Sequence, residues 1–177
     1  MQDRIPHQQA AERGRTGLDV EVRLSAELAA VVVGARRRAL RDGDRQIDTA
    51  HLLHTLLESD PDVREAFDSG PQLARLLGYL VQRSIGYGLR WQNSVEDSGA
   101  VPTLTGGEWS PVAAGALAAA YVRATRRGDR LAEGVDLLAA LVTEPESRAV
   151  EVLTRAGVDA RELLVRLDGA AERGIGA

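Results

Sequence analysis

The chain has 177 residues, the size of one ordinary domain, and its 44% hydrophobic and 27% charged content predicts a packed core rather than disorder. A net charge of −4 disfavours a general nucleic-acid binder, and because all 22 basic residues are arginine, a lysine Schiff base and a P-loop lysine are both excluded. The sequence has no cysteine for disulfides, thiol nucleophiles or thiolate metal sites, and no apolar run near the ~18 residues that span a membrane.

The two ends of the chain are predicted to be tails. Residues 1–23 are polar and contain glycines, which is typical of a flexible N-terminal segment. They lack the apolar region of a signal peptide, so we expect a cytoplasmic protein. Residues 169–177, with three glycines, are predicted to be a frayed C-terminal tail.

The first half of the chain is predicted to form four helices. Ser25 is a suitable N-cap for the first, and Gly43 fits a left-handed C-cap at its end. Asp48 can cap a second helix that carries leucines at helical spacing. Pro61 opens a third short helix and Pro71 a fourth, since proline is favoured at the first helical position.

A long connector and a second set of helices follow. Residues 85–108 hold five glycines and a proline without a sustained period, so they are predicted to join two halves. Helical periodicity then begins again at Ser110, an N-cap followed by proline, and this helix stops at Gly128. A later helix is predicted to open at Pro145, and Asp159 begins a capping box for the last one.

The two halves repeat one pattern. When the chain is shifted by 85 residues, residues 24–58 align without a gap on residues 109–143. The shift places Ser25 on Ser110, Gly43-Asp44-Arg45 on Gly128-Asp129-Arg130, and Leu52, Leu53 and Leu56 on Leu137, Leu138 and Leu141. An internal duplication of this period predicts two like subdomains packed together rather than a solenoid. The alternative is two similar amphipathic helix pairs that arise from composition alone.

The repeated stretches LSAELAAVVVGARRRALRDGDRQIDTAHLLHTLL and WSPVAAGALAAAYVRATRRGDRLAEGVDLLAALV carry a family resemblance, and SRAVEVLTRAGVDARELLVRL continues the second. They resemble the N-terminal domain of the Clp-family AAA+ unfoldases, in which each repeat has a Thr-Pro-Arg-Ala-type helix start, a Gly-His-Asn-type turn and a GTEHLLLGLL helix. The resemblance covers about residues 24–168. It implies an all-α fold with about eight helices, in which two four-helix repeats, 24–84 and 109–168, are related by a pseudo-twofold axis.

The resemblance also implies a function. Family members receive peptides, adaptors and, in some actinobacterial versions, cyclic peptide antibiotics near the helix starts. The residues that match this region are Leu24, Ser25, Thr49, His51, Trp109 and Ser110. We therefore expect a non-enzymatic module that binds a polypeptide, adaptor or cyclic peptide without a metal or cofactor. It would act as an adaptor, decoy or sequestering protein linked to Clp proteolysis, with a Clp ATPase as a further candidate partner.

The sequence departs from the family at two important points. Relatives that recognise phosphoarginine hold its guanidinium with the glutamate of each TEH motif, and those positions are Ala50 and Val135 here. Phosphoarginine binding is therefore not expected. The chain also has no G-x-x-x-x-G-K-[ST] motif and ends where the ATPase of the family would begin, so we expect a free-standing copy of a recognition domain.

Four other features of the sequence are candidate sites. The alternative function is a regulator that binds DNA through the arginines between Arg36 and Arg41, but a solvated helix flank paired with acids is favoured. His51, His54 and Asp48 could form a metal face; the favoured interpretation is a capping aspartate and an exposed His54. Ser25 and Ser110 are expected to cap helices rather than act as nucleophiles. Glu133 and Asp136 are expected to complement a helix N-terminus rather than form an acid pair.

The aromatic residues of the connector are a further clue, because aromatics make up only 3% of the chain. Tyr87, Trp91 and Trp109 are predicted to pin the connector across the seam between the halves. The alternative is that they line a groove for an apolar partner.

Overall fold

The computed structural model describes residues 22–67, 70–85, 96 and 108–175, which form eight α-helices without a β-strand. In the first half these are α1 (Ala26–Asp42), α2 (Thr49–Ser59), α3 (Pro61–Glu65) and α4 (Gly70–Ser84). In the second half they are α5 (Pro111–Arg127), α6 (Gly134–Leu141), α7 (Arg148–Arg155) and α8 (Ala160–Ile175). The predicted all-α class with about eight helices is confirmed.

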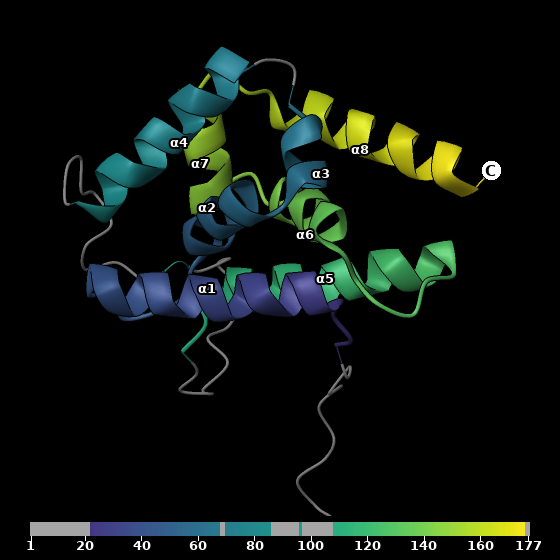
Figure 1. Cartoon of the computed structure of the whole chain (residues 1–177), viewed down its shortest axis with the longest axis horizontal. Helices are drawn as coiled ribbons and strands as arrows, with labels where there is room; N and C mark the ends of the chain where they lie inside the picture. Colours follow the sequence, from purple (N-terminus) through teal and green to yellow (C-terminus); the bar gives the residue numbers. More distant parts are fainter. Residues whose placement is uncertain (1–21, 68–69, 86–95, 97–107, 176–177) are drawn as a thin grey trace, which may run out of the picture.

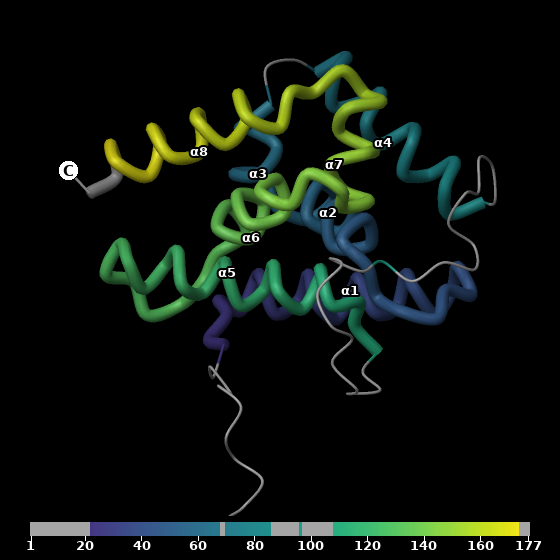
Figure 2. Tube along the Cα trace, turned by 180° about the vertical axis from the view of Figure 1, so that it is seen from behind, coloured from purple at the N-terminus to yellow at the C-terminus, as the bar shows by residue number. Residues whose placement is uncertain are grey.

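The helices are arranged in tiers around a central pair. The helices α2 and α6 contact each other in the middle, and α1 packs on α2 as α5 packs on α6 (Figure 1). On the opposite side of this pair, α4 and α8 extend from α7 in opposite directions, which is also clear from behind (Figure 2). Among the described residues, no helix is both long and apolar enough to span a bilayer.

The helix ends follow local signals in the sequence. The hydroxyls of Ser25 and Ser110 each accept a hydrogen bond from the backbone N–H three residues later, at 3.1 Å in both cases. Gly43 and Gly128 end α1 and α5 with φ angles of 73° and 93°, a conformation that favours glycine. These equivalent caps give both long helices 17 residues.

The core consists mainly of leucine and alanine. Fully buried leucines come chiefly from α2 and α6, including Leu52, Leu53, Leu56, Leu57, Leu137, Leu138 and Leu141. The buried faces of α1 and α5 carry small residues such as Ala35 and Ala120, which allow their partner helices to approach closely. The low aromatic content of the chain is therefore compatible with a continuous core that crosses from one half to the other.

Four backbone hydrogen bonds join the halves reciprocally. The segment before α1 pairs with the segment before α6, and the segment before α5 pairs with the segment before α2. The bonds are Ser25 N to Ala132 O (2.9 Å), Ala132 N to Arg23 O (2.9 Å), Ser110 N to Ile47 O (2.9 Å) and Ile47 N to Glu108 O (2.6 Å). The 85-residue shift interchanges the two pairs, as a pseudo-twofold relation between the halves requires.

The structure differs from the sequence-based predictions at two helix boundaries. The helix α7 begins at Arg148 rather than at Pro145, because the Ser147 side chain caps it by accepting from Val150 N at 3.2 Å. The helix α8 continues to Ile175, so the prediction of a frayed tail from residue 169 is wrong for 169–175. The alanines and charged residues there favour helix strongly enough to carry it through Gly169.

Other predictions fall outside the described part of the chain. The proposed N-terminal tail is described only at its last two residues, 22 and 23, and the connector only at residues 85, 96 and 108. Tyr87 and Trp91 also lie outside the described residues. Trp109 is described, is half-buried and packs against the core, as pinning of the seam requires.

A glycine at the contact between the halves generates the first prediction. A Cβ on Gly134 would lie 1.9 Å from Asp60 Oδ2 and 3.2 Å from Leu56 Cδ2. Asp60 cannot move freely, since its other oxygen caps α3 by accepting from Asp62 N at 3.0 Å. We expect Gly134→Ala to lower the free energy of unfolding by about 1–3 kcal/mol in urea denaturation, although alanine is the better helix former.

The matched control is Gly115→Ala in α5, where an added Cβ meets no atom within 4 Å. That variant should raise stability by roughly 0.5–1 kcal/mol through helix propensity alone. Equal responses of the two variants would contradict the close approach of α6 to Asp60.

Candidate functional site

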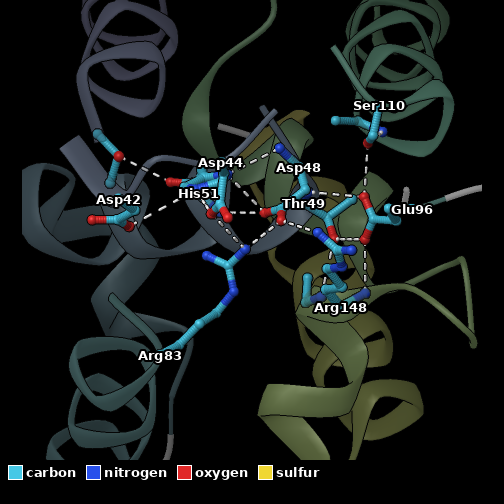
Figure 3. A network of polar contacts seen from close by, with 12 residues as sticks. Asp42, Asp44, Asp48, Thr49, His51, Arg83, Glu96, Ser110 and Arg148 are labelled. Atoms are coloured by element: carbon cyan, nitrogen blue, oxygen red, sulfur yellow. Dashed lines mark hydrogen bonds and ion pairs between the residues drawn. The ribbon is translucent and has the colours of Figure 1, made fainter. Parts of the chain in front are cut away.

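A buried carboxylate from the connector lies at the centre of the molecule. Glu96 Oε1 accepts from Thr49 N at 3.0 Å and from the Ser110 hydroxyl at 2.8 Å (Figure 3). Its Oε2 accepts from Arg148 N at 2.8 Å and from the Thr49 hydroxyl. Glu96 therefore joins the starts of α2, α5 and α7, where backbone N–H groups and helix dipoles favour a negative charge.

A second buried carboxylate continues this network. Asp48 is fully buried; its Oδ1 accepts from His51 N at 3.0 Å, and its Oδ2 accepts from Arg148 Nη1 at 2.6 Å and from Arg83. Burial alone raises the pKa of the Asp48 carboxyl. The hydrogen bond with His51 and the charges of Arg83 and Arg148 outweigh burial and hold that pKa well below its usual range.

His51 connects the network to the turn after α1. Its Nδ1 accepts from Asp48 N at 3.0 Å, and its Nε2 lies 2.8 Å from Asp44 Oδ2 and 3.9 Å from Asp42 Oδ2 (Figure 3). Burial lowers the pKa of the imidazole, but the contacts with Asp44 and Asp48 outweigh burial and raise it. The aspartates therefore favour a positive charge at this position.

The polar groups of this network bond to one another and so link the helices that carry them. Its hydroxyls are occupied: Ser110 bonds to Glu96, and Thr49 both bonds to Glu96 and accepts from Ala149 N at 3.0 Å. Thr49, His51 and Ser110 are all fully buried. A substrate has no access to these groups in this conformation.

The structure divides the six predicted ligand-binding residues into two sets. Thr49, His51 and Ser110 are buried and bonded within the protein, so they support the surface rather than contact a ligand in this state. Leu24, Ser25 and Trp109 are half-buried. Leu24 pairs with Ala132 and Trp109 pairs with Ile47, so these two lie at the two separate junctions between the halves. Ligand contact by the second set stays a prediction.

An open groove lies elsewhere, between α8 and the end of α5. Its volume is about 1050 Å³, and α3, α5, α6 and α8 all contribute to it. Ala66, Val135, Val165 and Leu167 supply apolar wall, and charged residues of both signs surround them. Sequence reasoning missed this groove because it treated the end of α8 as a tail. The available signal was Val165, an apolar residue on the outer face of an amphipathic helix, which is 70% exposed.

Three of the four arginines at residues 36–41 lie beside acidic side chains. Arg36 pairs with Glu108, Arg38 pairs with Glu58, and Arg41 Nε lies 3.5 Å from Asp42, which favours the predicted solvated flank over a DNA-binding surface.

The suspected acid pair at the start of α6 also has a structural role. Asp136 Oδ2 accepts from Glu133 N at 3.0 Å, and both Asp136 oxygens accept from Arg127. Glu133 and Asp136 therefore complement the N-terminus of α6, as predicted.

His54 is buried rather than exposed as predicted. It is 2% accessible, because every residue of α2 from 49 to 57 is buried. Burial and the charge of Arg38 lower its pKa from 6.5 to about 4, although Glu58, 3.1 Å from Nε2, opposes them. The two imidazoles do not converge on one position as a shared metal site requires. Nε2 of His51 lies beside Asp44, whereas Nε2 of His54 lies beside Glu58.

The Glu96 contacts predict a large stability loss on truncation. Glu96→Ala leaves the buried N–H groups of Thr49 and Arg148 and the Ser110 hydroxyl without their acceptor. We expect the free energy of unfolding to fall by at least about 3 kcal/mol in urea denaturation. Glu108→Ala is the control, since the Glu108 side chain is 59% exposed and its salt bridge within the described residues is to Arg36, and it should cost less than about 1 kcal/mol. Similar losses would show that Glu96 does not fasten the halves.

His54 predicts a pH dependence of stability. Its folded-state pKa of about 4 lies below the value of 6.5 in the unfolded chain, so stability is present above pH 6.5 and is lost as the pH falls towards 4. Between about pH 7.5 and pH 5, the native protein should lose up to about 2 kcal/mol more than His54→Gln. The variant keeps the other charged groups near residue 54, so they contribute to both pH profiles. These groups are His51, Arg38, Arg41, Asp42 and Glu58. Parallel pH profiles from chemical denaturation would contradict a neutral buried His54.

Comparison with known proteins identifies the fold. No family model matches the sequence, and no curated protein matches it. A structure described as "Preliminary structural investigations of a malarial protein secretion system" matches with a TM-score of 0.60 and 15% identity, over 85% of this chain and 96% of that one. The N-terminal domain of ClpD, a caseinolytic protease associated chaperone from Arabidopsis thaliana, matches with a TM-score of 0.57 and 15% identity, over 85% of this chain and 95% of that one.

At 15% identity these likenesses establish architecture rather than ligand or partner. They agree with the resemblance inferred from the two repeated stretches. The chain therefore has the fold of a Clp chaperone N-terminal domain.

Proposed function

We propose that this protein is a non-enzymatic module that binds a polypeptide segment in the groove between α8 and α5. The observation that carries the proposal is an open groove of about 1050 Å³ with an apolar wall and a charged rim. The fold supports it, since the N-terminal domain of a protease-associated chaperone has the same architecture. Exposed apolar surface bordered by polar residues is typical of protein-interaction sites.

The composition of the groove indicates the kind of segment it suits. Val135, in the wall, occupies the position where phosphoarginine-binding relatives would have a glutamate. An apolar side chain there favours an apolar group of the ligand over a guanidinium. Asp62 and Glu65 on α3 and Arg173 on α8 provide charges of both signs at the rim. A segment with one or two apolar anchors between polar residues would match this pattern.

The groove also connects to part of the predicted binding region. Leu24 pairs with Ala132, and the next residue, Glu133, lines the groove. Leu24 and Ser25 would therefore extend the binding surface at the start of α6. In this arrangement the protein would act as an adaptor, decoy or sequestering protein linked to Clp proteolysis, with an unfolded polypeptide, an adaptor or a cyclic peptide as its ligand.

The test compares two exposed apolar residues. Val165 is 70% exposed in the groove, and Leu40 is 74% exposed on α1 outside it. We expect a fluorescently labelled unfolded polypeptide to bind the native protein in an anisotropy titration. Val165→Asp should weaken binding about tenfold, or about 1.4 kcal/mol, because a charge replaces an apolar anchor.

Leu40→Asp should bind like the native protein, and both variants should keep the native melting temperature because neither side chain is in the core. A cyclic peptide and an adaptor protein should be titrated in the same way. Absence of binding by all three ligands would refute the proposed function. An equal loss in both variants would place the site outside the groove.

A further inference from the structure

Three potential metal ligands converge at the turn between α1 and α2. Asp42 is the last residue of α1, Asp44 follows the left-handed Gly43, and His51 lies in the first turn of α2 (Figure 3). One ligand atom of each lies within 4.8 Å of the others, and among the described residues this is the grouping of His, Asp and Glu side chains that could hold a metal ion.

The spacing of these atoms suits a small divalent ion. A tetrahedral zinc centre with bonds of about 2.0–2.2 Å places neighbouring ligand atoms about 3.4 Å apart. The separations from His51 Nε2, 2.8 Å to Asp44 Oδ2 and 3.9 Å to Asp42 Oδ2, lie on either side of this value. Shifts of about half an ångström in the two carboxylates would equalise them.

The imidazole itself supplies an independent indication. His51 Nε2 is fully buried between two carboxylates, 2.8 Å from Asp44 Oδ2 and 3.9 Å from Asp42 Oδ2, and neither contact has the direction of a good hydrogen bond. A buried imidazole nitrogen beside two carboxylate oxygens is a donor set that a divalent cation can use in place of a proton.

Each of the three ligands also has a supporting contact of the kind found around bound metals. Asp48 Oδ1 lies 2.9 Å from His51 Nδ1 and would accept its proton when a metal binds Nε2, in exchange for the present bond from Asp48 N. The Ser84 hydroxyl donates to Asp42 Oδ2 at 3.0 Å, and Arg83 Nη2 lies 3.3 Å from Asp44 Oδ2. Both come from α4, so the cluster joins three helices.

In the second half of the molecule, an arginine neutralises the carboxylates at the equivalent position. The 85-residue shift places Asp42, Asp44 and His51 on Arg127, Asp129 and Asp136. The Arg127 guanidinium bonds to Asp129 Oδ2 at 2.6 Å and to the two Asp136 oxygens at 2.7 and 3.0 Å. One built-in cation thus holds two carboxylates. The first half has an aspartate in place of that arginine, and the nearby guanidinium there comes from α4: Arg83 Nη2 lies 3.3 Å from Asp44 Oδ2.

We propose that Asp42, Asp44 and His51 bind one divalent transition-metal ion of the zinc class, with water as its fourth ligand. Nitrogen and carboxylate donors in this combination suit Zn²⁺ better than Ca²⁺ or Mg²⁺, which prefer oxygen alone. The ion would tie α1, α2 and α4 together, as Arg127 ties the end of α5 to α6. This site is independent of the groove and of the proposed function.

Isothermal titration of the full chain with Zn²⁺ tests the proposal. We expect saturable binding of a single ion, a Zn²⁺-dependent rise in melting temperature that a chelator reverses, and a tetrahedral visible spectrum with Co²⁺. Asp44→Asn should weaken binding at least about tenfold. Asp129→Asn, the equivalent change in the second half, should leave binding unchanged. His51 is not a suitable first target, because its side chain also caps α2.

Three outcomes would overturn the proposal: no saturable Zn²⁺ binding, native affinity in Asp44→Asn, or an equal loss in Asp129→Asn. If Asp44→Asn does not fold by circular dichroism, Asp42→Asn takes its place with the same expectations. If neither variant folds, the Co²⁺ spectrum of the unmodified protein decides, and absence of a tetrahedral spectrum would refute the site.

Discussion

The relation between the two halves depends on two buried carboxylates, Asp48 and Glu96. Apolar contact between α2 and α6 is strong but has little direction, so by itself it would permit the halves to slide. Asp48 is bonded to Arg83 in the first half and to Arg148 in the second. Glu96 is bonded to Thr49 in the first half and to atoms of the second. Any other register would leave these charges buried without partners, which costs far more than the pairs themselves contribute.

The halves share a backbone plan but differ in their chemistry. Equivalent caps, the equal lengths of α1 and α5, and reciprocal backbone pairing give the two halves a similar framework. Within it, the position of His51 is taken by Asp136, and that of Asp42 by Arg127. The positive charge in the second half is therefore part of the chain. In the first half Asp44 lies beside Arg83 of α4 and beside the His51 imidazole, which, unlike a carboxylate, can carry a positive charge.

Sequence reasoning succeeded where structure is determined locally and failed where it depends on distant contacts. The caps at Ser25, Gly43 and Ser110 follow from neighbouring residues, and they were predicted correctly. Glu96 was not singled out, because its partners come from three helices far apart in the chain. His54 was predicted to be exposed because helical periodicity identifies one buried face, whereas α2 is buried on every side by its neighbours. The groove was missed for a related reason: it exists only when four helices come together.

The burial of the predicted contact residues bears on where this fold can bind a ligand. Thr49 and Ser110 already share the carboxylate of Glu96, so an incoming anion at these helix starts would have to displace a buried internal one. Replacing the Glu96 carboxylate with another anion would gain little free energy, because Glu96 already supplies the negative charge that the three helix N-termini favour. Ala50 is fully buried beside them, and Val135 faces the groove instead. The binding proposed at the open apolar surface of α8 would not require the displacement of Glu96.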